Sequence, residues 1–198
     1  LQLKGAACEF VPVSLLNGEN EQPVHLARNP LGFVPVLELL DEPVDSPRRF
    51  LGESVAILMW LEERFPQPSL LPKDAWERAR AWQLAEIINS GTQPLQNPDI
   101  AAAVHPGDEA EQTQWNRKVT RRGLSAYELL VAGTASMYSV GTRVSIADLF
   151  LVPQLYNAER FGIDLSQEFP VLAHLKHVLL ASPGAQASHP DRFKPEGA

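Results

Sequence analysis

Two polar residues, Glu53 and Ser54, stand side by side directly before a segment whose apolar residues have helical spacing. The first turn of a helix leaves backbone N–H groups unpaired and carries partial positive charge, so a hydroxyl there can cap the helix or help to bind a carboxylate from outside. The neighbouring acidic side chain would suit an ammonium group. The pair therefore has two interpretations, a plain helix cap and a site for an amino-acid zwitterion.

The segment GFVPVLEL, residues 32–39, contains a second candidate site. Pro35 opens an apolar strand, but it has no N–H to give to a sheet. A cis Val34–Pro35 bond would turn the N–H and C=O of Val34 outward, where a peptide lying alongside could pair with them. Only about 5–6% of X–Pro bonds are cis, so the motif alone leaves the isomer open.

Other patterns of reactive residues are better explained by folding than by chemistry. His174 and His177 are spaced i, i+3, but no third metal ligand is near them in sequence, so we predict no metal site. No GxxxxGK or GxGxxG phosphate-binding loop occurs in the chain. Ser145 and Asp148 have the spacing of a capping box, with the hydroxyl at the N-cap and the carboxylate at N3. Ser145 is therefore assigned to folding and not to catalysis.

Composition limits the classes of function. The chain has 198 residues, a formal net charge of −7 and 44% hydrophobic residues, which is typical of a globular protein with a real core. The acidic balance argues against nucleic-acid binding, which needs clustered Lys and Arg. Cys8 is the one cysteine, so we expect no disulfide framework and a reducing, cytoplasmic setting. No apolar stretch approaches the length that crosses a membrane.

The hydrophobic periodicity predicts a small α/β domain followed by a larger all-helical domain. The first domain, residues 1–66, is expected to contain strands over residues 9–15 and 34–40, a returning strand from residue 50, and a helix that ends before Pro66. Residues 67–73 are too rich in proline for regular structure and form the predicted linker. The second domain, residues 74–198, is expected to hold helices over residues 74–90, 108–132, 145–161 and 170–181, with an irregular tail from residue 182.

Several longer segments together resemble the glutathione transferases. NPLGFVPVLEL, GESVAILMWLEERFPQPSLLP and VSIADLFLVPQ, in this order, are similar to the superfamily as a whole. SGTQPLQN, residues 90–97, and LVPQLYNAERFGIDL, residues 151–165, resemble the zeta class more particularly. The resemblance runs over nearly the whole chain. It implies a thioredoxin-like domain, here lacking its first strand and most of its first helix, followed by an all-helical domain.

The resemblance implies that glutathione is the cofactor and that the first domain binds it. Val34, ahead of a cis Pro35, is expected to pair through its backbone with the cysteinyl part of glutathione. Glu53 and Ser54 are expected to hold the γ-glutamyl end, which favours an external ligand over a plain cap.

The second domain is implied to contribute the substrate side of the site. Gln93 and Asn97 are expected near the ligand or a dimer contact; the alternative is hydrogen bonding within a helix bend interrupted by proline. Arg160 is expected to meet a substrate carboxylate, with Arg28 as a second candidate. The alternative for Arg160 is a surface or interdomain ion pair, which contributes little to stability.

The implied activity is glutathione-dependent cis–trans isomerisation of a doubly acidic diketo acid such as maleylacetoacetate, a step of tyrosine and phenylalanine catabolism. An alternative activity is glutathione conjugation or dehalogenation of small electrophilic acids. The alternative from another class is a transferase-like binding module without catalysis. The expected partners are a small acidic electrophile and a second copy of the chain, because the helix over residues 74–90 carries many apolar residues.

The family's thiol-activating segment, Ser-Ser-Cys followed by an Arg-containing helix, does not occur in this sequence. We do not assign its role to Cys8, which lies in the stretch leading to the first predicted strand. The first five residues resemble the end of a helix, with Lys4 in the last turn and Gly5 as the stop, so we expect the activating segment upstream of Leu1. The connector over residues 41–49 is longer than the hairpin usual in the family.

Overall fold

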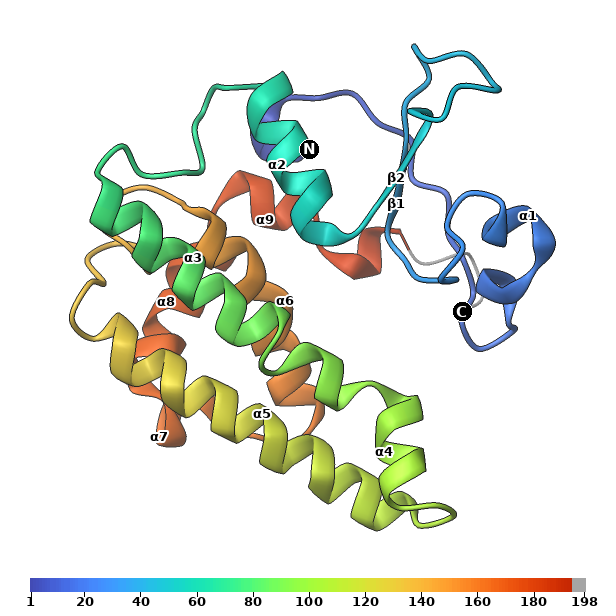
Figure 1. Ribbon diagram of the computed structural model, residues 1–198. Helices are drawn as coiled ribbons and strands as arrows, with labels where there is room; N and C mark the ends of the chain where they lie inside the picture. Colours follow the sequence, from blue (N-terminus) through green and yellow to red (C-terminus); the bar gives the residue numbers. More distant parts are fainter. Residues whose placement is uncertain (194–198) are drawn as a thin grey trace. The chain divides into compact units, whose positions relative to one another are not determined.

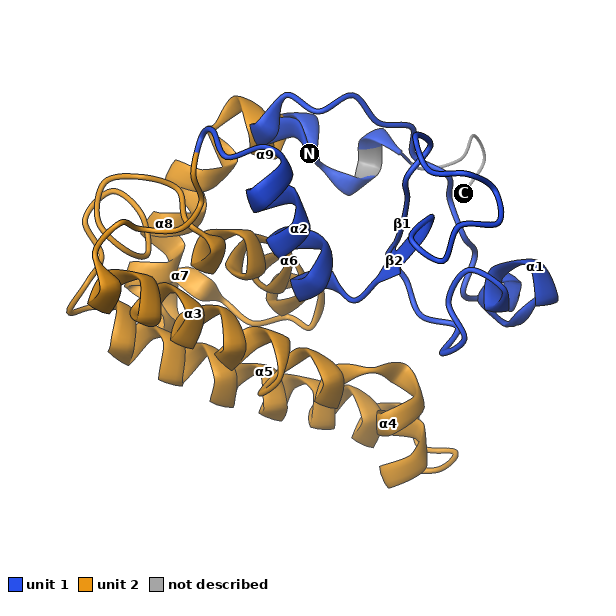
Figure 2. Cartoon of the chain, turned by 45° about the horizontal axis from the view of Figure 1, so that its top comes forward, with its two compact units in different colours: residues 1–68, 187–198 blue, residues 69–186 orange. Residues whose placement is uncertain are grey.

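The computed structural model describes residues 1–193 and divides into two compact units. Unit 1 comprises residues 1–68 together with the C-terminal segment from residue 187, and unit 2 comprises residues 69–186 (Figure 2). The division after Pro68 falls within the proline-rich segment, whereas the C-terminal segment groups with unit 1. Among the described residues, no helix has the length and apolar character needed to span a bilayer.

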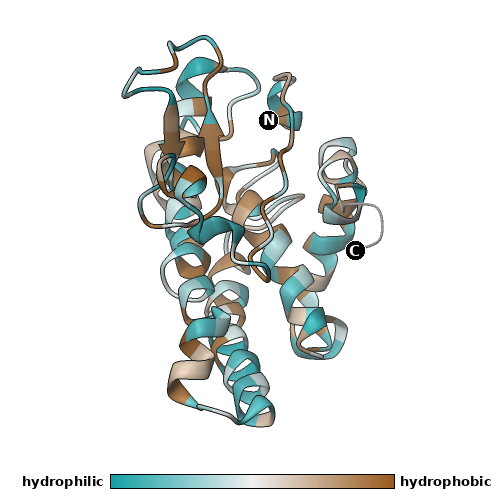
Figure 3. Ribbon diagram, turned by 90° about the vertical axis from the view of Figure 1, so that its right-hand side faces the viewer, coloured by the Kyte–Doolittle hydropathy of each residue, from teal (hydrophilic) through white to brown (hydrophobic). Residues whose placement is uncertain are grey.

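Unit 1 contains a two-stranded antiparallel sheet, and both strands are largely hydrophobic (Figures 1 and 3). Strand β1 (Val36–Glu38) pairs with β2 (Phe50–Gly52), with Val36 opposite Gly52. Arg49 holds the connector between them, because its guanidinium donates to Glu38 Oε1 (2.9 Å) and to the carbonyl of Glu42 (2.6 Å). The two strands predicted around residues 34–40 and 50 are thus confirmed, although each is three residues long.

Short helices complete unit 1. Helix α2 (Ser54–Arg64) follows β2 directly and buries Ile57 and Leu61, one turn apart. The Lys4 ammonium donates to Glu62 Oε2 (2.5 Å) and to the carbonyls of Phe65 (2.7 Å) and Pro68 (2.8 Å), which ties the first turn of the chain to the end of α2. The remaining elements are η1 (Gln2–Lys4), η2 (Glu19–Glu21), α1 (Pro23–Leu26) and η4 (Pro190–Arg192).

Unit 2 is helical, as predicted. The four predicted helices correspond, within one residue at each end, to α3 (Ala75–Asn89), α5 (Glu109–Val131), α6 (Ile146–Arg160) and α8 (Pro170–Leu180). The unpredicted shorter elements are η3 (Gln93–Gln96), α4 (Pro98–Val104), α7 (Leu165–Glu168) and α9 (Pro183–Ala187). Carboxylate or amide oxygens at the N-caps accept from first-turn N–H groups of α3, α4, α5 and α7; these residues are Asp74, Asn97, Asp108 and Asp164.

The core of unit 2 lies where α3 packs against α6 and α5. Leu84, Leu124 and Leu155 are fully buried there. Helix α5 comes close to the turn after α3 at Gly123, because a Cβ on this glycine would lie only 2.0 Å from Thr92 Oγ1. Thr92 is itself buried, so the contact leaves no room for a larger residue.

A buried polar network fixes the start of α6. The Asp148 carboxylate accepts from the backbone N–H groups of Ser139 (2.9 Å) and Ser145 (2.8 Å) and from the Ser145 hydroxyl (3.1 Å). The predicted capping box is therefore confirmed. The Tyr127 hydroxyl lies within hydrogen-bonding distance of Ser139 Oγ (2.9 Å) and of the Ala147 carbonyl (3.2 Å). Burial is the main cause that raises the pKa of Tyr127 far above its ordinary value, with the nearby Asp148 charge adding to it.

Three expectations were wrong. Residues 9–15 form no strand, because among the described residues β1 pairs only with β2 and Pro12 lacks an N–H to donate. The tail from residue 182 is not wholly irregular, since Pro183 and Pro190 each begin a short helical turn; residues 194–198 lie outside the described part. Leu84 and Ile88 of α3, taken as apolar surface for a second copy, belong to the core of their own unit.

Candidate functional site

The loop before β1 holds the Val34–Pro35 bond in the cis form, as the glutathione-binding interpretation requires. Two buried side chains fix this loop. Asn29 Nδ2 donates to the Phe33 carbonyl (3.0 Å), and His25 Nε2–H donates to the same oxygen (3.1 Å). The polar tips of two residues of unit 1 therefore set the position of the residue directly before Val34.

The main chain of Val34 has no partner within the described part of the chain. Neither its N–H nor its C=O takes part in a hydrogen bond there, and the residue is 43% exposed. At the end of the adjoining strand, Leu39 N–H donates to Arg49 O (2.8 Å), and since ladder bonds alternate along an antiparallel strand, the backbone groups of Val36 and Glu38 face away from β2. An extended peptide could pair with the main chain of Val34.

The start of α2 is the second part of the site in unit 1. Glu53, and not Ser54, occupies the N-cap, and no side chain caps the helix. The interpretation of Ser54 as a plain helix cap is therefore wrong, because Ser54 is the first helical residue. The first hydrogen bond of the helix runs from Ile57 N–H to the Glu53 carbonyl (2.9 Å), so the N–H groups before it remain available to an anion.

Glu53 has a backbone conformation that side chains rarely adopt, with φ 66° and ψ 118°. A non-glycine residue in this region carries strain, and such residues cluster at functional sites. The Glu53 side chain is exposed. This carboxylate is therefore presented to solvent at the N-terminus of α2.

The sheet register brings the two parts together. Val36 lies opposite Gly52, so Pro35 and Glu53 flank the same end of the ladder. Asn29 also connects the parts, because a Cβ on Gly52 would lie 3.3 Å from Asn29 Nδ2. Val34, Pro35, Glu53 and Ser54 are thus collected at one end of a two-stranded sheet.

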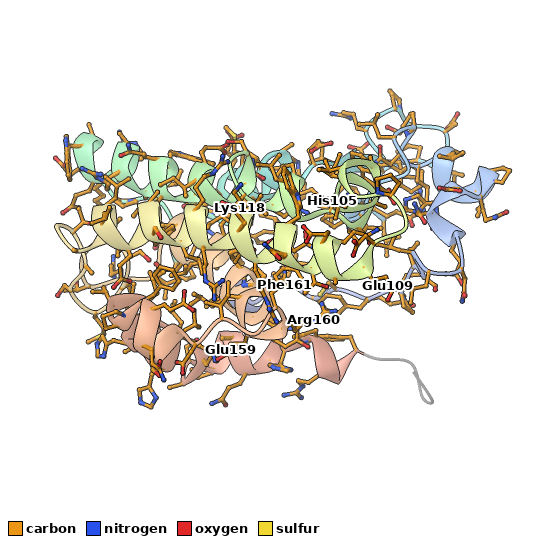
Figure 4. The ribbon with its side chains drawn as sticks, turned by 90° about the horizontal axis from the view of Figure 1, so that it is seen from below. His105, Glu109, Lys118, Glu159, Arg160 and Phe161 are labelled. Atoms are coloured by element: carbon orange, nitrogen blue, oxygen red, sulfur yellow. The ribbon has the colours of Figure 1, made fainter. Side chains whose placement is uncertain are left out.

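The candidates in unit 2 are less closely grouped. Gln93 is exposed in η3. Asn97 accepts from the Asp99 N–H (3.0 Å) and caps α4, which agrees with the alternative of hydrogen bonding at a helix bend. Arg160 lies at the end of α6 (Figure 4) and is exposed. Its guanidinium carbon lies 5.9 Å from the centre of the Tyr156 ring.

Two further candidates from the sequence lie in unit 1. Arg28 is half-buried and lies 5.9 Å from the centre of the Phe50 ring. Cys8 is exposed. Neither of these two side chains contacts Val34 or Ser54 through a hydrogen bond in the described residues.

Residues that sequence reasoning missed hold the site in place. In unit 1 these are His25 and Asn29, and the sequence signal was a polar pair four residues apart, whose second member begins the NPLGFVP segment. In unit 2 the side chains of Gln96 and Gln154 donate to each other (2.9 and 3.0 Å), and Thr120 Oγ1 donates to Gln96 Oε1 (3.0 Å). This buried cluster joins η3, which carries Gln93, to α5 and α6.

Comparison with known proteins gives a consistent answer. The Glutathione S-transferase, N-terminal domain family matches residues 1–69, and the Glutathione S-transferase, C-terminal domain family matches residues 87–183. A zeta-class glutathione S-transferase of Euphorbia esula is 39% identical over 97% of this chain and 83% of its own length. The maleylacetoacetate isomerase of Rattus norvegicus is 40% identical over 97% of this chain and 85% of its own length.

The fold is also similar to that of a solved structure. The maleylacetoacetate isomerase of Anaeromyxobacter dehalogenans 2CP-1, crystallised with GSH bound in its active site, is 45% identical with a TM-score of 0.86 and covers 100% of this chain and 89% of its own. The family matches extend over well more than half of the sequence, and both relatives exceed 30% identity. The chain therefore belongs to the glutathione S-transferase family, in its zeta class.

Proposed function

We propose that this protein is a glutathione-dependent isomerase that converts maleylacetoacetate to fumarylacetoacetate. The observation that carries the proposal is that a Val34 main chain without a described partner and the uncapped N-terminus of α2 lie at the same end of the sheet. The similarity to maleylacetoacetate isomerases of the rat and of Anaeromyxobacter dehalogenans supports the choice of substrate.

The residues present fit glutathione. The N–H and C=O of Val34 match the backbone of a cysteinyl residue lying antiparallel to them, with one donor and one acceptor on each side. The γ-glutamyl end carries a carboxylate and an ammonium group. The first-turn N–H groups and hydroxyl of Ser54 suit the carboxylate, and the exposed Glu53 carboxylate suits the ammonium.

When bound, glutathione supplies a thiolate that adds reversibly to a conjugated double bond, so that the bond can rotate before elimination. The chain's own contribution is to hold and orient the reactants. Val34, Glu53 and Ser54 fix the tripeptide, while the Arg160 guanidinium orients a substrate carboxylate through charge-assisted hydrogen bonds. Gln93 and Asn97 act near the ligand, and we assign no thiol-activating role to the exposed Cys8.

The proposal is tested with purified protein, glutathione and maleylacetoacetate, by following formation of the trans product. Arg160→Ala should raise KM for the diacid about tenfold or more, because a charged hydrogen-bonded pair contributes roughly 1.5–3 kcal/mol. KM for a neutral electrophile such as an aryl halide should change far less. The matched control is Arg143→Ala, which removes another exposed arginine of unit 2.

Two outcomes point to other functions. Turnover of halo acids without isomerisation would favour conjugation or dehalogenation, and binding of glutathione without either reaction would favour a non-catalytic module. Equal effects of Arg160→Ala on the diacid and on the neutral electrophile would contradict the role of this arginine.

We also propose that the enzyme acts as a cytoplasmic homodimer. Trp76 of α3 and Leu129 of α5 support this, because they are 59% and 78% exposed and large apolar side chains are commonly covered at interfaces. Sedimentation at micromolar concentration should give twice the chain mass. A monomer under these conditions would contradict the assembly but not the isomerase assignment.

A further inference from the structure

An open groove of about 700 Å³ runs along one face of α5 in unit 2, within the size range of small-molecule sites. The residues that line it recur every three or four positions and so share one helical face: Ala110, Gln114, Arg117, Lys118 and Arg121. The buried residues of α5 are at other positions, including Val119, Thr120, Gly123 and Leu124. The groove therefore lies on the face of α5 that does not form the core.

Two guanidinium groups of the groove are held in place by the fold. Arg117 Nε donates to the Phe161 carbonyl (2.5 Å), beside the end of α6 (Figure 4). A Cβ on Gly162 would lie 3.1 Å from Arg117, so the guanidinium rests against this glycine. Arg121 donates to both oxygens of Glu168 (2.7 and 2.9 Å). Arginines that are already ordered lose less conformational entropy when they bind an anion.

Not all of the positive charge in the groove is paired with carboxylates. The side chain of Lys118, on α5 (Figure 4), makes no hydrogen bond or ion pair with any residue that the structure describes. Arg117 uses only its Nε in the described hydrogen bonds, which leaves its two terminal nitrogens as donors. The three cations of the groove outnumber the two nearby carboxylates, Glu168 and Asp164, in a chain whose net charge is −7.

We propose that this α5 groove binds a small polyanion that carries carboxylate or phosphate groups. Lys118 lies four residues after Gln114 and three residues before Arg121 on the groove face, so an anionic group at Lys118 has a further donor one turn away in either direction. A second anionic group about 6 Å along the helix would reach the field of Arg121. The site is independent of the proposed isomerase activity, because none of the residues assigned to glutathione or substrate lines the groove.

Isothermal titration calorimetry on the full chain, saturated with glutathione, tests the proposal with pyrophosphate and citrate as probes at an ionic strength near 10 mM. We expect saturable binding of at least one probe, and the stronger one identifies phosphate or carboxylate as the preferred group. Lys118→Gln and Arg117→Gln should each weaken binding about fivefold or more, since each removes one of two unpaired cations. Raising the ionic strength to about 150 mM should also weaken it, because the Debye length falls from about 30 to 8 Å.

Two variants test where on the chain the anion binds. Arg122→Gln removes the same charge from an exposed position of α5 outside the groove, and binding should remain within twofold of wild type. Arg160→Gln removes the contact proposed for a substrate carboxylate, so the anion binding that depends on Lys118 should persist in this variant. Thermal unfolding of Lys118→Gln should match wild type because its side chain bonds to none of the described residues, whereas Arg117→Gln should have a lower Tm because it loses the hydrogen bond to the Phe161 carbonyl.

Three results would overturn the proposal. The first is the absence of saturable binding for both probes at low salt. The second is an equal loss of anion binding in Arg122→Gln and Lys118→Gln, which would indicate attraction by the overall positive charge of α5 and no defined site. The third is loss of binding in Arg160→Gln alone, which would place the anion at the end of α6 and outside the groove.

Discussion

Replacing Asn29 by alanine should weaken glutathione binding although Asn29 is not expected to touch the ligand. Its side chain donates to the Phe33 carbonyl (3.0 Å) and accepts from the Leu31 N–H (3.2 Å), and the residue is only 8% exposed. Each such hydrogen bond contributes about 0.5–1.5 kcal/mol, so their loss should free the loop that presents Val34 at a cost of about 2 kcal/mol. If the loop must be reordered upon binding, Kd for glutathione rises up to about 30-fold.

Titration calorimetry with glutathione measures this effect, and two variants sharpen it. Asn29→Asp keeps an acceptor for Leu31 but faces a carboxylate oxygen against the Phe33 carbonyl, so it should not restore binding. Asn17→Ala changes an exposed asparagine of the same unit and should bind as wild type. A lower Tm for Asn29→Ala with an unchanged Kd would refute the reasoning, because it would make Asn29 a purely structural residue.

Three further predictions concern stability and are measured by urea unfolding. Gly123→Ala should destabilise by about 1–3 kcal/mol or more, because the new methyl group would meet Thr92 Oγ1 at 2.0 Å. Asp148→Asn should lower the free energy of unfolding by about 2–4 kcal/mol, because the buried carboxylate accepts three hydrogen bonds and the NH2 group of an amide would face donors. An unchanged urea midpoint in either variant would contradict the packing described. The hydrogen bond from Arg121 lowers the pKa of Glu168 below its ordinary value. The free energy of unfolding of Glu168→Gln should therefore be slightly lower than that of wild type at neutral pH, and this difference should vanish as the pH falls through the lowered pKa.

The long helices and the sheet could be predicted because their signals are local. Helices α3, α5 and α6 begin directly after Asp74, Asp108 and Ser145, and a cap followed by apolar residues at helical spacing is visible in the sequence itself. The strands β1 and β2 were likewise marked by β-branched and apolar residues on either side of a proline-rich connector.

The errors and omissions have a common physical cause: they depend on partners distant in sequence or on backbone angles. Val11 and Val13 have strand propensity, but a strand requires a neighbour to pair with and propensity does not supply one. Glu53 occupies the N-cap in place of Ser54 and has a positive φ. A positive φ is normally predicted only for glycine, so nothing in the sequence indicated it at a glutamate. The role of Asn29 depends on the carbonyl of Phe33, and a carbonyl has no sequence signature.

Binding of glutathione by Val34 and the start of α2 can be tested directly by titrating ¹⁵N-labelled protein with glutathione and following the backbone amide signals. We expect saturable shifts of the Val34 N–H and of the first-turn amides of α2, Ser54 and Val55, all with one Kd. These N–H groups have no hydrogen-bond partner among the described residues. Saturable shifts confined to other residues, with Val34 and Ser54 unmoved, would contradict the central claim.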